Sequence, residues 1–214
     1  VEKRAVRDSA EQAGAKEVYL IHEPMAAALG IGIDVTEPIG NMIIDIGGGT
    51  TGITVIALAG IVCDQSIRIA GDEFTADIME ALRRYHSLLI GERTAEQIKI
   101  LIGAAMKDLD SPPDDIPVNG RDLVTGIPKQ IMVSYQEIAE ALDKSIFKIE
   151  EAILKALETT PPELASDIYK RGLYLTGGGA LLETRSPPMP VGFVSFLNVP
   201  FAIIFFILSS SITI

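Results

Sequence analysis

The sequence is poor in cysteine, histidine and basic side chains. Cys63 is the single cysteine among 214 residues, which excludes an internal disulfide and a zinc site built on several thiolates. His22 and His86 are far apart in the sequence, which argues against a histidine-rich metal cluster. Lysine and arginine number 18 against 29 acidic residues, so the formal net charge is -11. This charge argues against general binding to nucleic acid or to anionic membrane surfaces.

Hydrophobic residues make up 48% of the chain, too many for a disordered protein and enough for one full domain or two small ones. The chain starts at Val1 without a secretory pattern, so we expect an internal start or an unusual start codon. The composition changes abruptly in the apolar tail, residues 183–214. Three interpretations of the tail stay open: a foreign or frame-shifted segment, a membrane-seeking segment, or a pair of buried hydrophobic strands.

Hydrophobic periodicity, with glycine and proline as breakers, predicts strands mixed with helices. We expect strands at 18–21, 42–46, 53–58, about 61–69 and 173–175. We expect helices at 4–14, 25–30, 72–90, 94–106 and 134–157, with a short one after the prolines at 161 and 162. Ser134 followed by Glu137 resembles a capping box at the start of the longest helix. The segment 112–133 is expected to be rich in loops.

A first candidate for phosphate binding runs from Asp45 to Thr51, where three glycines join two predicted strands. Glycines let backbone N–H groups turn toward an anion, and Asp45 at a strand end can hold a hydrated Mg²⁺. The segment lacks the lysine of a Walker A loop, and a strand follows it instead of the helix of a Rossmann fingerprint. The pattern alone therefore fits either a phosphate loop or an ordinary hairpin turn.

A second glycine segment, residues 177–179, follows the predicted strand 173–175 and precedes an expected helix start at Ala180. Free N–H groups at a helix start favour an anion or a nucleotide, although an ordinary strand-to-helix turn has the same pattern. Two glycine segments at two strand ends could together clamp one nucleotide from both sides.

Two further candidates involve acidic side chains. Glu23 lies just before Pro24, where its carboxylate can orient a water for attack on phosphorus, and a solvated turn residue is the simpler alternative. Glu96 and Lys99 share one helix face, and their spacing alone favours a surface ion pair of little energetic weight.

Several segments in this order resemble the MreB family of bacterial actin-like, cell-shape-determining proteins. The resemblance covers about residues 1–182 and rests on EPMAAALG (23–30), MIIDIGGGTTGITVIAL (42–58), GDEF (71–74), LLIGERTAEQIKILIGAA (88–105), GRDLVTGIPK (120–129) and TPPELASDIYKRGLYLTGGGALL (160–182). The two glycine motifs alone fit the whole actin superfamily, including chaperone ATPases and sugar kinases. The segments GERTAEQIK and GRDLVTGIPK are narrower and point to MreB or its close paralogues.

The resemblance implies an α/β, actin-like ATPase fold of the ribonuclease-H-like type, incomplete in this chain. It implies ATP and Mg²⁺ as cofactors and slow ATP hydrolysis coupled to filament dynamics, which we expect to be impaired here. The implied partners are further copies of the chain in filaments, the cell-wall elongation machinery and the inner membrane, without nucleic acid. The implied role is determination of rod cell shape, in the cytoplasm at the inner face of the cell membrane.

The resemblance also implies roles for individual residues. Glu23 and Thr50 would position the hydrolytic water, and Asp45 would bind Mg²⁺ through water. Nucleotide contacts would come from Gly48, Gly49, Thr50, Glu96, Gln97, Ile98, Lys99, Gly177, Gly178, Gly179 and Ala180. Under the resemblance, Glu96 and Lys99 are therefore an adenosine-side contact and not a plain surface pair.

The chain departs from the family pattern in several places. The first phosphate motif, the N-terminal lobe that carries it and the hydrophobic membrane-binding elements are absent from the sequence, and His22 and Gly52 stand where glutamate is expected. The resulting division is a remnant of the N-terminal lobe (1–38), the core of the second lobe (39–70 and 134–182), a small outer subdomain (71–133) and the atypical tail (183–214).

Two other classes of function stay open from the sequence. One is a monomeric actin-fold ATPase, either a phosphotransferase or a chaperone-type ATPase, although no insertion for a sugar or peptide site is visible. The other is an inactive truncated product. Sedimentation with Mg-ATP separates a filament former from a monomeric enzyme.

Overall fold

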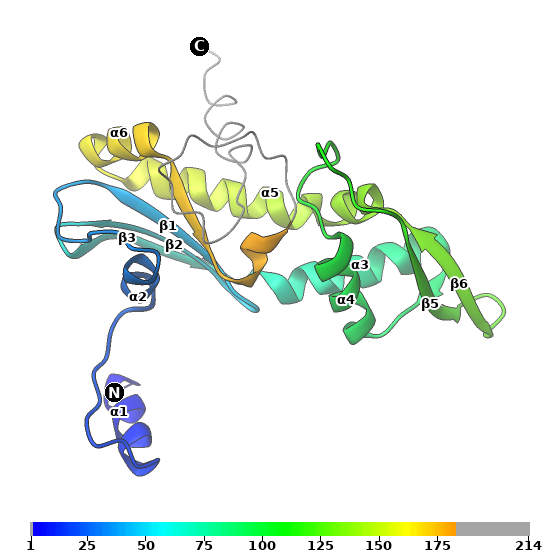
Figure 1. Cartoon of the computed structure of the whole chain (residues 1–214), viewed down its shortest axis with the longest axis horizontal. Coiled ribbons are helices and arrows are strands. Elements are labelled where there is room, and N and C mark those ends of the chain that lie inside the picture. The colour runs from blue at the N-terminus through cyan, green and yellow to red at the C-terminus, as the bar shows by residue number, and fades with distance from the viewer. Residues whose placement is uncertain (1, 183–214) are drawn as a thin grey trace.

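The computed structural model describes residues 2–182, so the apolar tail lies outside the described residues. Two β-sheets lie toward opposite ends of an elongated molecule, and helices connect them (Figure 1). The larger sheet has the strand order β3-β2-β1-β7. Its first three strands form an antiparallel meander, and the last strand runs parallel to β1. Their bounds are β1 (Asn41–Ile46), β2 (Thr51–Ala57), β3 (Gly60–Ile67) and β7 (Leu173–Thr176).

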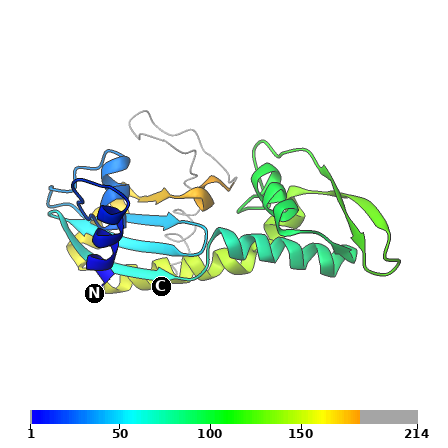
Figure 2. The ribbon, with the colours of Figure 1, turned by 90° about the horizontal axis from the view of Figure 1, so that it is seen from below.

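Helices cover both faces of the larger sheet. The long helix α5 (Tyr135–Thr159) runs along one face, and α2 (Glu23–Gly30) packs on the other (Figures 1 and 2). Alternate side chains of β1 follow this division, because Met42 and Ile44 join the core that includes α5 while Ile43 packs with Ala28 of α2. An inner strand covered on both faces is apolar almost throughout, which explains the run in β1.

The smaller sheet consists of β4 (Leu88–Leu89), β5 (Ile116–Asp122) and β6 (Pro128–Val133), all antiparallel. The expectation of a loop-rich segment at 112–133 is therefore wrong. Proline is tolerated at strand ends, and Pro117 and Pro128 stand at the second and first positions of their strands. In the sequence these prolines look like loop signals. In the structure they stand at or next to the first residues of the two strands of a hairpin.

Helices α3 (Gly71–His86) and α4 (Glu92–Ile102) lie between the two sheets. The helix predicted at 72–90 is too long, because Ser87 takes a left-handed conformation with φ of 52° and residues 88–89 pair with β5 instead. One continuous core includes Met42 of β1, Phe74 of α3 and Val118 of β5. The two sheets are therefore parts of one packed unit.

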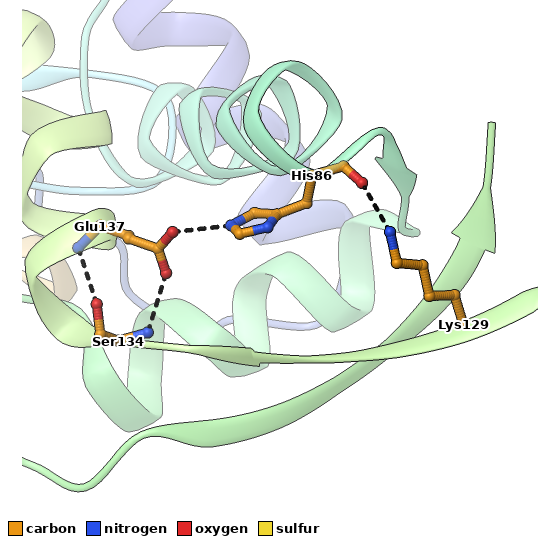
Figure 3. Close-up of polar contacts among 4 residues, drawn as sticks. All are labelled: His86, Lys129, Ser134 and Glu137. Carbon is orange, nitrogen blue, oxygen red and sulfur yellow. Dashed lines mark hydrogen bonds and ion pairs between the residues drawn. The ribbon is translucent and has the colours of Figure 1, made fainter. Parts of the chain in front are cut away.

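The capping box predicted at the start of α5 is confirmed. The Glu137 N–H donates to Ser134 Oγ at 3.4 Å, and the Ser134 N–H donates to Glu137 Oε2 at 3.2 Å. Figure 3 shows that the same carboxylate also contacts His86, whose Nε2 lies 2.8 Å from Glu137 Oε1. Lys129 of β6 donates to the His86 carbonyl at 3.3 Å. This cluster ties the end of α3 to α5 and to the smaller sheet.

The remaining elements are α1 (Glu2–Gln12), α6 (Pro162–Arg171) and the 3₁₀-helix η1 (Gly178–Leu181). The strand predicted at 18–21 does not form, since within residues 2–182 no other strand pairs with this segment and Tyr19 is 85% exposed. Of the helices in the described part of the chain, none is both long and apolar enough to cross a membrane.

Candidate functional site

A cleft of about 780 Å³ opens where the first glycine turn, the starts of α3 and α4, and η1 converge. It brings together glycines from both predicted phosphate segments with the predicted Glu96 and Lys99. The residues that line it are Gly47, Gly48, Gly71, Asp72, Phe74, Thr75, Glu92, Arg93, Glu96, Lys99, Ile100, Gly178, Gly179, Leu181 and Leu182.

The first glycine turn joins β1 to β2 and is held against the start of α3. The Gly47 N–H donates to the Thr50 carbonyl at 3.0 Å and closes the turn. The Gly71 N–H donates to the Gly47 carbonyl at 3.0 Å, and the Asp72 N–H donates to the Gly48 carbonyl at 2.7 Å. The first amides of α3 therefore fix the position of the turn, and they are not free to bind an anion.

The second glycine segment is packed closely against the end of β1. A Cβ on Gly177 would come closer than 3.0 Å to the Ile46 carbonyl oxygen and to Asp45 Oδ1, and one on Gly179 would overlap the Ile46 side chain. A Cβ on Gly178 would meet nothing within 4 Å. The helix expected from Ala180 is only the four-residue 3₁₀ turn η1, so the argument from a helix N-terminus is not supported.

A polar network on the cleft wall joins α3 to α4. Lys99 Nζ lies 2.5 Å from Glu96 Oε2 and donates to the Gly71 carbonyl at 2.8 Å. The hydroxyl of Thr75 accepts from Lys99 at 3.0 Å and lies 2.8 Å from Glu96 Oε2. The hydrogen bond from Lys99, together with the one from Thr75, lowers the pKa of the Glu96 carboxyl below its ordinary value. The carboxylate is thus held ionised at the cleft.

Thr75 and Asp72 are among the residues of this cleft that sequence reasoning misses. Thr75 stands one helical turn after Gly71, directly beyond the GDEF segment, and the spacing from Gly71 is the signal that could have found it. Asp72 is exposed at the start of α3, and its carboxylate lies beside the first turn. A Cβ on Gly48 would be 3.5 Å from Asp72 Oδ1. A negative side chain here suits a cation or its waters better than a bare anion.

The other predicted residues lie around the cleft or away from it. Asp45 is half-buried near the end of β1, beside Thr176 in the parallel register. Glu23 is exposed at the start of α2 and Thr50 is exposed in the first turn, and neither is among the residues that line the described cleft. Among the α4 residues, Gln97 is exposed and Ile98 faces the core with 2% of its surface exposed. No group of three or more potential metal ligands gathers within residues 2–182.

Comparison with solved structures defines the class of protein. The crystal structure of MreB5 of Spiroplasma citri bound to ADP matches with a TM-score of 0.81 and 40% identity, over 85% of this chain and 55% of that chain. The cryo-EM structure of the MamK filament matches with a TM-score of 0.64 at 19% identity, which shows the fold alone. The chain has an actin-like fold.

The family model described as MreB/Mbl protein matches residues 1–186, and the chain belongs to the MreB/Mbl family. It is 52% identical over 186 residues to the cell shape-determining protein MreB of Escherichia coli (strain K12). It is 48% identical over 183 residues to the cell shape-determining protein Mbl of Bacillus subtilis (strain 168). Each match covers 86% of this chain and 52% or 54% of the relative, so the chain spans about half the length of these curated relatives.

Proposed function

We propose that the chain is the nucleotide-binding part of an actin-like protein that polymerises into filaments and helps to determine rod cell shape. The observation that carries this proposal is the cleft, in which both glycine segments meet Glu96 and Lys99. The solved MreB5 structures are described as bound to ADP and to AMPPNP, which supports a nucleotide as the ligand. Solved filaments of MamK, which shares the fold, support self-association.

The chemistry of the cleft fits half of a nucleotide site. The exposed backbone of Gly48 and Gly178 can approach phosphate oxygens without hindrance from a Cβ. Apolar Ile100 and Leu181 are exposed at the cleft, where they offer surface for a base. The ionised Glu96 can accept hydrogen bonds from sugar hydroxyls. We therefore propose ATP as the ligand, with adenosine on the side of α4 and phosphates on the side of the first turn.

The proposed metal is Mg²⁺, which would neutralise phosphate charge when bound. Asp45 would hold its waters, and Asp72 of α3, whose carboxylate lies beside the first turn, adds a second carboxylate nearby. Glu23 and Thr50 would orient the water that attacks the terminal phosphate. Gly49, Gln97, Ile98, Gly177 and Ala180 would contribute backbone near the ligand.

The biological part of the proposal extends to partners and place. As a member of a cell-shape family, the filament would act in the cytoplasm at the inner face of the membrane and organise cell-wall synthesis. These partners follow from the family, and the described cleft bears only on the nucleotide.

The test is sedimentation of the full chain with Mg-ATP, with Mg-ADP and without nucleotide. Pelleting that depends on Mg-ATP supports a filament former. Binding of ATP without pelleting would instead indicate a monomeric actin-fold ATPase, and no binding at millimolar ATP would overturn the nucleotide assignment. Lys99→Gln should reduce the pelleted fraction, whereas Lys155→Gln, at an exposed position of α5, serves as the matched control.

A further inference from the structure

Thr75 is a buried polar residue of the cleft, at the place where α3, α4 and the first glycine turn come together. Its side chain is on α3, and only 4% of its surface is exposed. Its hydroxyl contacts Lys99 Nζ at 3.0 Å, Glu96 Oε2 at 2.8 Å and the Gly71 carbonyl at 3.0 Å. A buried hydroxyl within hydrogen-bond distance of three other residues, two of them on another helix, does more than bond the backbone of its own helix.

The donors and acceptors of this network balance. The Lys99 ammonium has three N–H groups, and it has three partners within hydrogen-bond distance, in Glu96, Thr75 and the Gly71 carbonyl. The Thr75 hydroxyl accepts from Lys99, and its one proton is best given to the Glu96 carboxylate, since a charged acceptor forms the stronger bond. Lys99 therefore has no donor left over for a ligand, and its side chain is only 13% exposed.

The same network reaches the first glycine turn through a single residue. The Gly71 carbonyl accepts from Lys99 and lies 3.0 Å from the Thr75 hydroxyl oxygen, while the Gly71 N–H donates to the Gly47 carbonyl at 3.0 Å. A Cβ on Gly71 would lie 3.2 Å from the Gly47 carbonyl oxygen and 3.4 Å from Lys99 Nζ. Little space is therefore left at Gly71 between the first glycine turn and Lys99. Gly71 is therefore in contact with Lys99 on one side and with the first glycine turn on the other.

We propose that Thr75 is a positioning residue, which fixes Glu96 and Lys99 as one rigid unit and connects that unit through Gly71 to the first glycine turn. The part that concerns ATP rests on the proposed function. Thr75 acts on the ligand through Glu96, and it links the sugar side of the cleft to the phosphate side.

The first test measures the affinity of the full chain for ATP in variants of Thr75. Thr75→Val keeps the shape and removes the hydroxyl, and it should weaken ATP binding by about tenfold. Thr75→Ser restores the hydroxyl and should bind within about twofold of the parent. Thr160→Val is the matched control, because Thr160 is also buried and also bonds a helix carbonyl four residues earlier, at 2.7 Å, outside the cleft.

A double-mutant cycle separates positioning from general damage. If Thr75 acts through Glu96, Thr75→Val should cost little further affinity in a Glu96→Gln background. Equal losses in both backgrounds, or failure of Thr75→Ser to restore affinity, would overturn the proposal. Thr75→Ala takes the place of Thr75→Val if the valine variant unfolds at a lower temperature than Thr160→Val.

A second test needs no nucleotide. Hydrogen exchange of the Gly71 and Asp72 amides, which donate to the turn carbonyls, should be faster in Thr75→Val and near the parent rate in Thr75→Ser and Thr160→Val. Unchanged exchange in Thr75→Val contradicts the link to the turn. If the parent chain does not bind ATP, the proposed function fails, and this exchange measurement still decides the role of Thr75.

Discussion

Three consecutive glycines, 177 to 179, meet different surroundings, although the sequence makes them look equivalent. Gly177 has a φ of 83°, and its missing Cβ leaves room for the end of β1. Gly178 faces open space at the cleft. Packing against the end of β1 thus leaves no room for a side chain at Gly177 or Gly179, whereas Gly178 between them is available to a ligand.

Substitution of Gly177 by alanine should therefore destabilise the fold. A left-handed conformation is unfavourable for alanine, and the new Cβ would collide with the Ile46 carbonyl, so we expect a loss of at least about 2 kcal/mol in the free energy of unfolding. Urea unfolding measures it. Gly178→Ala is the matched control and should stay within about 0.5 kcal/mol of the parent. Equal stability of the two variants would show that Gly177 is not constrained.

The contribution of Glu96 to stability should depend on pH. Hydrogen bonds from Lys99 and Thr75 lower the pKa of Glu96 in the folded chain below its ordinary value. A depressed folded pKa contributes stability above the unfolded pKa and loses it as the pH falls through the folded pKa. The parent should therefore be more stable than Glu96→Gln near pH 7, and this difference should shrink below about pH 4.5.

Urea unfolding of both proteins between pH 7 and pH 3 measures this difference, and the comparison cancels the titration of the other carboxylates. Glu92→Gln controls for the removal of one carboxylate from the same helix, because within residues 2–182 Glu92 forms no ion pair. A parent-minus-variant difference that does not depend on pH would contradict the assigned network.

At the scale of elements, α3 is joined to α5 by a bond between two side chains. Ser145 is 1% exposed and donates to Asp77 Oδ2 at 2.5 Å. Burial raises the pKa of Asp77 above its ordinary value, and the bond from Ser145 opposes that rise. Ser145→Ala should cost about 1–3 kcal/mol at neutral pH, since it leaves a half-buried carboxylate without this donor.

The loss in Ser145→Ala should be smaller at low pH. Without the donor, the pKa of Asp77 rises further in the folded chain. The variant therefore loses unfolding free energy mainly at pH values where Asp77 is ionised, and it loses much less where Asp77 is protonated. Unfolding free energies at pH 7 and pH 3.5 test this sign. Ser166→Ala, at an exposed helix position of α6, should change stability by less than about 0.5 kcal/mol at either pH.

Elements whose signals are local could be predicted from the sequence. The capping box at Ser134 and Glu137 marked the start of α5, and the glycine turn between β1 and β2 marked a hairpin. The sequence does not predict the hairpin β5–β6, because Pro117 at the second position of β5 resembles a loop signal. The end of α3 was misplaced, because the left-handed Ser87 is set by the pairing of β4 with β5, which is a tertiary effect.

The sequence alone singles out the glycine segments and the Glu96–Lys99 pair, which the structure places at one cleft. The adenosine-side role of the pair follows only from the family resemblance and stays a prediction. The four-residue spacing from Gly71 places Thr75 on one face of α3, but the sequence does not show that α3 packs on α4 and on the first turn. The contacts of Thr75 with Lys99 and of Asp72 with the turn depend on that packing. The roles given to Glu23 and Thr50 stay predictions, as do the division into lobes and the three interpretations of the apolar tail.

At the scale of the whole molecule, the cleft is built from parts that belong to different layers. The first turn and η1 follow strands of the larger sheet, while α3 and α4 connect to the smaller sheet. A ligand that contacts all of them binds the folded chain only, because unfolding separates these segments. Binding must then stabilise the whole packed unit and not one sheet alone.

We therefore expect Mg-ATP to raise the unfolding temperature of the full chain in a single transition. At an ATP concentration about 100 times the dissociation constant, linkage adds about 2.7 kcal/mol, which corresponds to roughly 5–10 °C for a chain of this size. Calorimetry with increasing ATP measures the shift, and Glu96→Gln should need more ATP for the same rise. Two separate transitions, of which only one shifts with ATP, would contradict this expectation. They would show that the nucleotide contacts only the cleft residues connected to one of the two sheets.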